Sequence, residues 1–376
     1  MSVLFIMPNW YSPSELWLHR MINMMEDEIN TIACYNPAKK KYNGKIPAVN
    51  LFDCSFLARV KNKLNLTQQG NNVNYRGLNS VIKRNNIKKI FIHYLTSVVN
   101  LSKLIETSEI PVYIHCHGYD VIWDRKKRSG ELIHPEDYVD MVRSLSDKVF
   151  FIANSHYTAN KLKQIEIKEE RIIVKSYGVA TPPSPTIRSN KGKLKILYLG
   201  RFVDFKGPDL VIQAFDRAKK EGLNAELIMA GDGRLMFSCD LLKRRSAYSD
   251  DIHFLGETDA ITGDRLRQEA DIFTAHNCTG VLSNQEEALG VSVLEAMSAS
   301  LPVISGRNGA LTETVVENET GILVEPGDID EHARAFLKLA QDIELRNTMG
   351  AAGWQRVKDY YSYEIEQQKL KNIFGD

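Results

Sequence analysis

The chain has 376 residues, a formal net charge of +1 at pH 7, and 43% hydrophobic and 25% charged residues. These values are ordinary for a globular protein, and the length predicts two or three domains, each with its own core. No apolar run approaches the roughly 20 residues that a membrane-spanning helix needs, and the first residues lack the basic region of a signal peptide. Five scattered cysteines without a CxxC pair indicate neither a disulfide framework nor a zinc site, and they favour a reducing, cytosolic setting.

Positive charge is concentrated in the first half of the chain. Residues 31–89 hold 12 Lys or Arg and one acidic residue, Asp53, with apolar side chains interspersed. Such a stretch binds nucleic acid or an anionic membrane, or it is simply a solvated face. Because no nucleic-acid recognition motif is present, we expect no nucleic-acid partner and a peripheral contact with the anionic inner face of the cytoplasmic membrane.

The first half alternates strand-like and helix-like segments. Helical patterns lie between most of the apolar runs, and this alternation predicts an α/β fold with a parallel, doubly wound sheet. The basic segment 36–72 has no pattern from which its elements can be placed. The expected strands are 2–7, 31–34, 89–93, 112–116, 149–153 and 171–174, and the expected helices are 15–27, 75–85, 98–107, 135–145 and 155–164.

Candidate ligand residues follow the carboxyl ends of these strands, where open α/β sheets bind their ligands. The loop after the first strand holds Trp10, Tyr11, Ser14 and Glu15. Its aromatic rings either stack on a sugar or pack against protein, and Ser14 is a candidate N-cap for the next helix.

A histidine pair ends the strand at 112–116. His115 and His117 are two positions apart on an extended chain, so they share a face and either ligate a metal or pack in the core. The sequence places no third ligand beside them, so we predict no metal site. His117 with Gly118 instead brings an imidazole and an approachable backbone to the ligand-binding edge of the sheet.

The second half begins after a Pro, Ser and Thr-rich segment at 181–186, which predicts a domain boundary. We expect a first domain at 1–185, a second at 186–355, and a helix at 356–376 that crosses back to the first. The expected strands are 194–199, 225–230, 252–256, 271–275, 301–305 and 321–324, and the expected helices are 208–220, 291–299, one opening at 309–311, 328–343 and about 345–371.

Two cations follow the strand at 194–199. Gly200 and Arg201 lead into a loop, and Lys206 precedes the helix at 208–220. Arginine binds phosphate oxygens in a forked geometry, lysine adds a point charge, and a helix N-terminus favours anions. Either cation alone would be an ordinary surface residue, but the pair at a strand–helix junction predicts a diphosphate site that needs no metal.

Two carboxylates, Glu287 and Glu295, flank the expected start of a buried helix. Gly290 marks the turn into this helix, whose first N–H groups are available to a phosphate. A carboxylate accepts hydrogen bonds well from the paired hydroxyls of a sugar. A glutamate pair at this spacing is by itself expected by chance. The cations and glycines at the neighbouring strand and helix ends support its assignment to a ligand site.

This pattern resembles the retaining nucleotide-sugar glycosyltransferases of family 4, which have the GT-B fold of two Rossmann-like doubly wound domains facing a central cleft. In the first half the resemblance rests on residues 117–120, 154–155 and 177–179, and the segment from Pro8 to Trp17 is similar to polysaccharide and lipopolysaccharide transferases. In the second half it rests on Gly200-Arg201 with Lys206-Gly207, Ala230-Gly231-Asp232-Gly233, Phe254-Leu255-Gly256, Glu287 to Glu295, Leu301-Pro302-Val303-Ile304 and Gly321-Ile322-Leu323-Val324.

The resemblance implies a role for each candidate residue. Arg201 and Lys206 would hold the donor diphosphate, with Gly200, Gly231 and the backbone of Leu289, Gly290 and Val291 around it. Glu295 would bind the ribose, while Glu287 and His117 would meet the transferred sugar. Trp10, Tyr11, Ser14 and Glu15 would lie on the acceptor side. Ala288 and Leu289 stand where the family commonly has Gly and Phe, which bears on the identity of the donor sugar.

The expected activity is therefore transfer of a hexose or N-acetylhexosamine from a nucleotide sugar, UDP-linked, to a lipid-diphosphate-linked saccharide in surface polysaccharide or O-antigen synthesis. The resemblance implies that neither a cofactor nor a metal takes part. Two other readings remain open: a GT-B nucleotide-sugar epimerase or phosphorylase, and a two-lobed sugar- or nucleotide-binding protein without catalysis.

Overall fold

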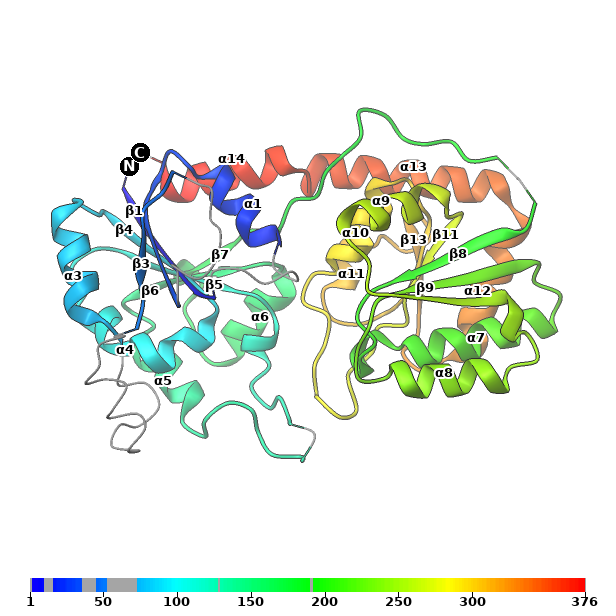
Figure 1. The fold of residues 1–376 in the computed structure, drawn as a ribbon, viewed down its shortest axis with the longest axis horizontal. Helices are drawn as coiled ribbons and strands as arrows, with labels where there is room; N and C mark the ends of the chain where they lie inside the picture. Colours follow the sequence, from blue (N-terminus) through cyan, green and yellow to red (C-terminus); the bar gives the residue numbers. More distant parts are fainter. Residues whose placement is uncertain are drawn as a thin grey trace. The chain divides into compact units, whose positions relative to one another are not determined.

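The computed structural model describes residues 2–9, 16–35, 45–52, 73–127, 129–189 and 192–375 (Figure 1). Contacts divide the chain into two units. Unit 1 consists of residues 1–123, 134–176 and 366–376, and unit 2 of residues 124–133 and 177–365. Each unit is built on one parallel sheet, as the alternating strand and helix pattern predicts. The predicted domain ranges and their roles in acceptor and donor binding stay predictions.

Unit 1 contains a seven-stranded sheet in the order β3-β2-β1-β4-β5-β6-β7. Its strands are β1 (Val3–Asn9), β2 (Ile29–Tyr35), β3 (Ala48–Asn50), β4 (Lys89–His93), β5 (Val112–Cys116), β6 (Val149–Ala153) and β7 (Ile172–Val174). Its helices are α1 (Leu16–Met24), α3 (Tyr75–Arg84), α4 (Val98–Glu106), α5 (Tyr138–Ser144) and α6 (His156–Gln164), with short 3-10 turns η3 (Leu95–Ser97), η4 (Tyr119–Val121) and η5 (Glu169–Arg171).

The central strands of unit 1 are apolar on both faces because helices cover both (Figure 1). Ile90 and Ile92 of β4 share one core cluster with Leu78 of α3 and Leu101 of α4. The opposite face of the same strand carries Phe91 and His93, and it is covered by α1 and by the end of α14 (Tyr363–Phe374). The strand alternation thus sends aliphatic side chains to one layer and aromatic ones to the other.

Unit 2 contains a six-stranded sheet in the order β10-β9-β8-β11-β12-β13. Figure 1 shows α7 and α8 on one face of this sheet and α9, α10 and α13 on the other. The strands are β8 (Leu194–Leu199), β9 (Ala225–Ala230), β10 (Ile252–Gly256), β11 (Ile272–Thr274), β12 (Val303–Gly306) and β13 (Gly321–Val324). The helices are α7 (Pro208–Lys220), α8 (Met236–Arg245), α9 (Ala260–Glu269), α10 (Val291–Ser298), α11 (Leu311–Thr314), α12 (Ile329–Gln341) and α13 (Ile343–Tyr360), with η6 (Asp204–Lys206) and η7 (Ser249–Asp251).

The prediction of a single helix at about 345–371 is wrong, because the helix ends at Tyr360 and a second helix, α14, begins at Tyr363. At the break, the backbone N–H of Val179 donates to the carbonyl of Tyr361 at 2.8 Å, and Val179 forms a parallel bridge with Ser362. These backbone groups pair with a neighbouring segment instead of continuing the helix. The segment Lys358-Asp359-Tyr360-Tyr361-Ser362 contains no proline or glycine that would mark the break in the sequence.

The last turns of α14 belong to unit 1 and are fixed there by a buried ion pair. Lys175, which follows β7, is fully buried and its ammonium contacts the carboxylate of Glu366 on α14. Phe374 packs against Phe91 and Tyr113, with ring centroids 4.6 and 5.1 Å apart. The contact between a late helix and an early sheet therefore combines apolar burial with a charge pair that water does not reach.

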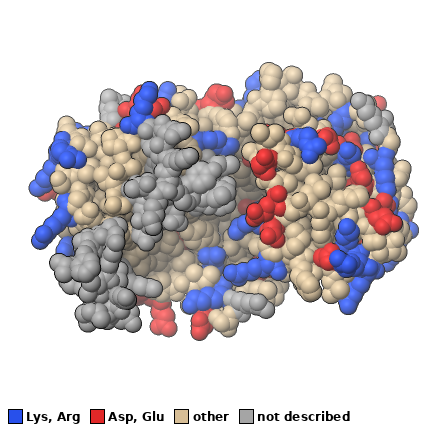
Figure 2. Space-filling model, in the orientation of Figure 1, with Lys and Arg blue, Asp and Glu red and all other residues tan. Residues whose placement is uncertain are grey.

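Two predictions concern residues that the structure does not describe. Trp10, Tyr11, Ser14 and Glu15 lie outside the described residues, as do residues 36–44 and 53–72 of the basic stretch at 31–89. Among the described helices, none is both long and apolar enough to cross a membrane. On the face that Figure 2 shows, positive and negative side chains are interspersed over unit 2.

Removal of one partner of the buried ion pair should destabilise unit 1. We expect Glu366→Ala to lower the free energy of unfolding by about 3–5 kcal/mol, because it leaves the Lys175 ammonium buried without its counter-charge. Glu364→Ala, an exposed position on the same helix, is the matched control. Chemical denaturation measures both, and equal stability of the two variants would contradict a structural role for the pair.

Candidate functional site

In the sheet of unit 2, the order in which successive strands are added reverses at β8. From this strand the chain first adds β9 and β10 on one side, and then β11, β12 and β13 on the other. In open parallel sheets, ligands bind at the carboxyl ends of the strands where the order reverses. The loops that follow β8 and β11 therefore form the candidate site of unit 2.

The loop after β8 carries the two predicted cations. The backbone of this loop is tied down by Tyr198, whose hydroxyl donates to the carbonyl of Arg201 at 2.7 Å. Arg201 is exposed, while the Lys206 side chain is only 15% exposed. Both cationic groups lie 5.5 Å from the centre of the Phe205 ring, so one buried aromatic side chain supports both.

Gly231, on the neighbouring β9 loop, is a glycine for a steric reason. Its φ is +130°, and a Cβ atom there would lie 2.0 Å from the carbonyl oxygen of Gly200. Any other residue would force the β8 and β9 loops apart. The predicted donor-site residues Gly200 and Gly231 are thus brought together by close backbone packing.

Glu287 is the most constrained carboxylate of the site. Its Oε2 accepts from the Lys206 ammonium and, at 2.9 Å, from the side-chain amide of Asn277. Its Oε1 accepts from the backbone N–H of Gly290 at 3.1 Å. Burial opposes ionisation, but Lys206, the Gly290 N–H and Arg201 together hold the pKa of Glu287 below its ordinary value. The carboxylate is therefore charged at neutral pH, and each of its oxygens accepts a hydrogen bond from the protein.

The segment between β11 and α10 is held by Asp204 of η6. The Asp204 carboxylate accepts from the backbone N–H groups of Leu282 and Ser283, both at 3.0 Å, and from the Ser283 hydroxyl. In the same region the N–H of Cys278 donates to the carbonyl of Phe205 at 3.0 Å. The loop that presents Glu287 is thus fastened to the loop that presents Lys206.

Helix α10 begins at Val291, as predicted, and Gly290 before it has a left-handed conformation with φ 79° and ψ 55°. A Cβ at this position would lie 2.5 Å from Leu311, so glycine suits both the turn and the packing. Leu289 is buried and Val291 is half-buried. The first N–H groups of a helix lack intrahelical partners and attract anions, so the predicted phosphate position has a physical basis here.

Glu295 lies further along α10 and has a partner that the sequence did not reveal. Its carboxylate contacts Arg267 of α9 at 3.1 Å, and the Arg267 side chain is only 9% exposed. Arg267 also pairs with Asp264 at 2.6 Å. A carboxylate oriented by a buried guanidinium is well placed to accept hydrogen bonds from a diol. The helix α9 was not predicted, so nothing in the sequence marked Arg267.

A pair of buried histidines lies behind the Glu287 loop. His276 Nδ1 and His332 Nδ1 are 2.8 Å apart, and His332 Nε2 is 2.8 Å from the Thr274 hydroxyl. Because the Gly327 N–H donates to His276 Nε2, the His276 proton lies on Nδ1 and is donated to His332. Burial lowers the pKa of His276 to about 4 and that of His332 further below its ordinary value. This neutral chain joins β11 to α12.

In unit 1, three histidines meet at the carboxyl ends of β4 and β5. His93 pairs in register with His115, so the two side chains share a face, and His117 follows on the same face. His93 Nδ1 lies 3.3 Å from His117 Nε2. The prediction that no third ligand stands near His115 and His117 is wrong, because strand pairing, which a sequence does not reveal, brings in His93.

The surroundings keep the three imidazoles uncharged. Burial, reinforced by the charge of Lys175, holds the pKa of each histidine well below its ordinary value. The backbone N–H groups of His117 and Gly118 donate to the buried Asp120 carboxylate at 2.8 and 2.9 Å. Burial raises the pKa of Asp120 to about 6 despite these bonds. The turn after β5 is thus held by the Asp120 carboxylate, a role that the sequence did not reveal.

Comparisons with known proteins agree with this architecture. Residues 184–356 match the family model of the glycosyl transferases group 1. A GDP-mannose-dependent mannosyltransferase of Corynebacterium glutamicum, which acts on monoacylated alpha-(1-6)-phosphatidylinositol monomannoside, is 28% identical over 269 residues, or 68% of each chain. The O-antigen biosynthesis glycosyltransferase WbnH of Escherichia coli is 26% identical over 257 residues, covering 67% of this chain and 68% of WbnH.

Solved structures show the same fold over the whole chain. The structure of HepE of Anabaena in complex with UDP aligns with a TM-score of 0.75 at 16% identity and covers 99% of both chains. The similarity at this identity is one of fold, and it confirms the predicted GT-B class with its two parallel sheets.

The pKa of Glu287 gives a pH-dependent prediction. A carboxylate with a lower pKa in the folded chain than in the unfolded chain stabilises the folded state at pH values above its ordinary pKa. This stabilisation is lost as the pH falls from the ordinary pKa through the lower pKa of the folded state. We expect Glu287→Gln to be about 1.5–3 kcal/mol less stable than the parent at neutral pH. The difference should shrink at acidic pH, below the ordinary glutamate pKa. Urea denaturation at several pH values measures it.

The exposed Glu319 provides the control, since Glu319→Gln removes a charge from the same unit without touching Glu287. A stability difference for Glu287→Gln that stays constant down to strongly acidic pH would contradict the ionic role of this carboxylate.

Proposed function

We infer that the chain is a group 1 glycosyltransferase, a retaining GT-B enzyme of family 4 that uses a nucleotide sugar, because residues 184–356 match the model of that family. On this premise we propose its substrates and site. The donor is a UDP-linked hexose or N-acetylhexosamine, and the acceptor is a lipid-diphosphate-linked saccharide of a bacterial surface polysaccharide. The similarity to an O-antigen glycosyltransferase supports this class of acceptor.

The contact between Lys206 and Glu287, 81 positions apart, carries the assignment of the site. It gathers an ammonium, a carboxylate and the start of α10 at the edge of the sheet where its strand order reverses. Arg201 acts on the same carboxylate through its charge. Such a group of fixed charges is suited to a diphosphate on one side and sugar hydroxyls on the other.

In the proposed reaction, the bond between the anomeric carbon and the donor phosphate breaks while the acceptor oxygen bonds to that carbon from the same face. The acceptor proton passes to the departing phosphate oxygen. Arg201 and Lys206 stabilise the charge that develops on this phosphate, and Glu287 binds the sugar hydroxyls. Catalysis then consists of positioning and electrostatic stabilisation. Glu295, oriented by Arg267, binds the ribose, and His117 lies next to the transferred sugar.

A second candidate donor is GDP-mannose, which the similarity to the corynebacterial mannosyltransferase favours. Arg201 and Lys206 can bind the diphosphate of either nucleotide. The two candidate donors therefore differ in how the base and the sugar are recognised, and not in this diphosphate clamp.

We further propose a peripheral contact with the inner face of the cytoplasmic membrane, carried by the basic stretch at 31–89. A lipid-linked acceptor requires such a contact, and each basic residue near an anionic surface adds about 1 kcal/mol. Cosedimentation with vesicles should require anionic lipid and fall as salt increases. Binding that ignores both would remove this proposal.

A panel of UDP- and GDP-linked sugars, read out by release of the nucleoside diphosphate with and without a saccharide acceptor, tests the function. We expect release that depends on the acceptor and survives a chelator. Turnover without an acceptor would favour an epimerase or phosphorylase, and binding without release would favour a non-catalytic protein. Glu287→Ala should abolish transfer, and full activity in this variant would refute its assigned role.

In the same assay system, Arg201→Ala and Lys206→Ala should each weaken UDP binding by about 1.5–3 kcal/mol, the contribution of one hydrogen bond to a charged group. Arg217→Ala is the control, because Arg217 is an exposed cation in the last turn of α7, paired with Glu221 and Asp330. Calorimetry measures all three, and equal losses in control and site variants would exclude a specific clamp.

A further inference from the structure

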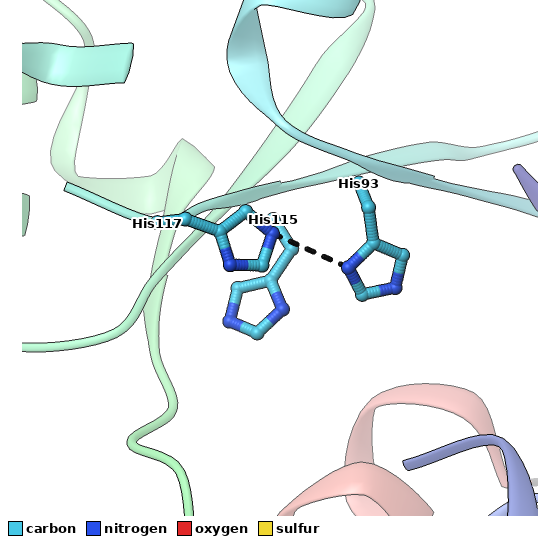
Figure 3. A group of neighbouring side chains, drawn as sticks. All are labelled: His93, His115 and His117. Carbon is cyan, nitrogen blue, oxygen red and sulfur yellow. Dashed lines mark hydrogen bonds between the residues drawn. The ribbon is translucent and has the colours of Figure 1, made fainter. Parts of the chain in front are cut away.

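We propose that His93, His115 and His117 form a site for one transition-metal ion, with zinc as the ion that fits best. One potential ligand nitrogen from each side chain lies within 4.8 Å of the other two. Figure 3 shows the three rings gathered at the ends of two neighbouring strands, with His93 and His117 joined by the dashed contact. Of these three residues only His117 also has a role in the proposed transfer, and the residues proposed to bind the donor diphosphate and ribose belong to unit 2.

The spacing of the rings suits a shared ion. Zinc binds imidazole nitrogens at about 2.0–2.1 Å in tetrahedral geometry, which separates two ligand atoms by about 3.4 Å. His93 Nδ1 and His117 Nε2 are already 3.3 Å apart. The third ring has to approach by at most about 1.4 Å from the 4.8 Å limit, and rotation about the soft χ2 angle of histidine provides such movements.

The fold holds the ligands on rigid elements. His93 and His115 are directly opposite each other in the β4–β5 register and both are fully buried. His117 is the half-buried member, so an ion and its fourth ligand reach the cluster from its side. Three histidines with one open position are a known arrangement for zinc. Cys116 lies between His115 and His117 and points to the other face of the strand, so the site is one of nitrogen ligands only.

The charges around the cluster have to be compatible with a cation. The Lys175 ammonium is close enough for its charge to act on all three rings, but the Glu366 carboxylate contacts it and offsets that charge. On the other side, the Asp120 carboxylate bonds to the backbone of His117 and Gly118. The aromatic rings of Phe5, Trp17 and Tyr94 lie 4.3–4.7 Å from a histidine ring and bring no further charge to the cluster.

The alternative is that the three imidazoles only pack against these aromatic side chains. Absorption spectroscopy distinguishes the two interpretations. It is done on the full chain, from which a chelator has removed any metal, without donor or acceptor. Addition of Co²⁺ should produce the intense visible absorption of a tetrahedral ion at one equivalent per chain, and Zn²⁺ should displace it. Weak absorption that grows without saturation would overturn the proposal.

Variants identify the ligands. His93→Phe and His115→Phe keep an aromatic ring of similar size and should each weaken Zn²⁺ binding by at least tenfold, the smallest effect that loss of even an outer partner of a metal site has. His156→Ala removes an exposed histidine of α6 and should leave the affinity unchanged. Equal affinity in both phenylalanine variants and the parent would overturn the proposal.

Thermal unfolding keeps the test decisive if a variant folds poorly. Binding to the folded chain alone raises its stability in proportion to the logarithm of the free ion concentration. The parent should therefore show a rise in Tm with Zn²⁺ that is absent from His115→Phe, and no rise in the parent would count against the site.

A consequence for activity rests on the proposed function. If His117 meets the transferred sugar, Zn²⁺ should slow transfer and a chelator should restore it, while transfer itself proceeds without metal. If His117 has no such role, Zn²⁺ still binds but leaves transfer unchanged, so the metal site and the proposed function fail separately.

Discussion

The carboxylate of Glu287 is the constraint on which the arrangement of the site depends. It joins Lys206 after β8, Asn277 after β11 and Gly290 at the start of α10. Its own backbone carbonyl accepts from Ala310 at 2.8 Å, which adds the loop after β12. The loops after three neighbouring strands, β8, β11 and β12, are thus joined through one residue. Because protein donors hold both carboxylate oxygens, the ion pair positions Lys206 before any ligand arrives.

The two units place different chemistry at equivalent positions of their sheets. In unit 2 the strand ends carry opposite charges that neutralise each other. In unit 1 the strand ends carry three uncharged imidazoles among aromatic rings, and the nearby charges of Lys175 and Asp120 are buried. Charged groups suit a ligand that arrives with its own phosphates, whereas neutral nitrogen ligands suit a soft cation or a sugar. The sheet topology fixes where chemistry occurs, and the residues that follow each strand decide its kind.

Much of this fold follows from local patterns in the sequence. The strands at 112–116 and 149–153 and the helix at 208–220 have the predicted bounds. A continuous apolar run marks a strand buried on both faces, and Pro208 after a glycine marks a helix start. The helix α8 was missed because its exposed apolar side chains, such as Phe237 at 82% exposure, give no clear amphipathic pattern.

The candidate site was predictable where a residue lies in a motif and not where it is supplied by tertiary packing. Arg201, Lys206, Glu287 and Glu295 stand at recognisable strand and helix ends. Strand register or helix packing brings in three further residues, and both depend on residues far apart in the chain. Asn277 contacts Glu287, Arg267 contacts Glu295, and His93 contacts His117. His93 illustrates the limit, because its partner His115 is known only once β4 and β5 are paired.

The composition of unit 1 has a consequence for its biosynthesis. Its sheet comes from residues before 177, but the covering helix that supplies Glu366 and Phe374 follows all of unit 2 in the sequence. On the ribosome, Phe91, Tyr113 and the Lys175 ammonium stay uncovered while nearly two hundred further residues are added. Unit 2 is almost continuous and is complete earlier. The usual order, in which the N-terminal domain finishes folding first during synthesis, is therefore reversed, because unit 1 lacks part of its cover until the last residues are added.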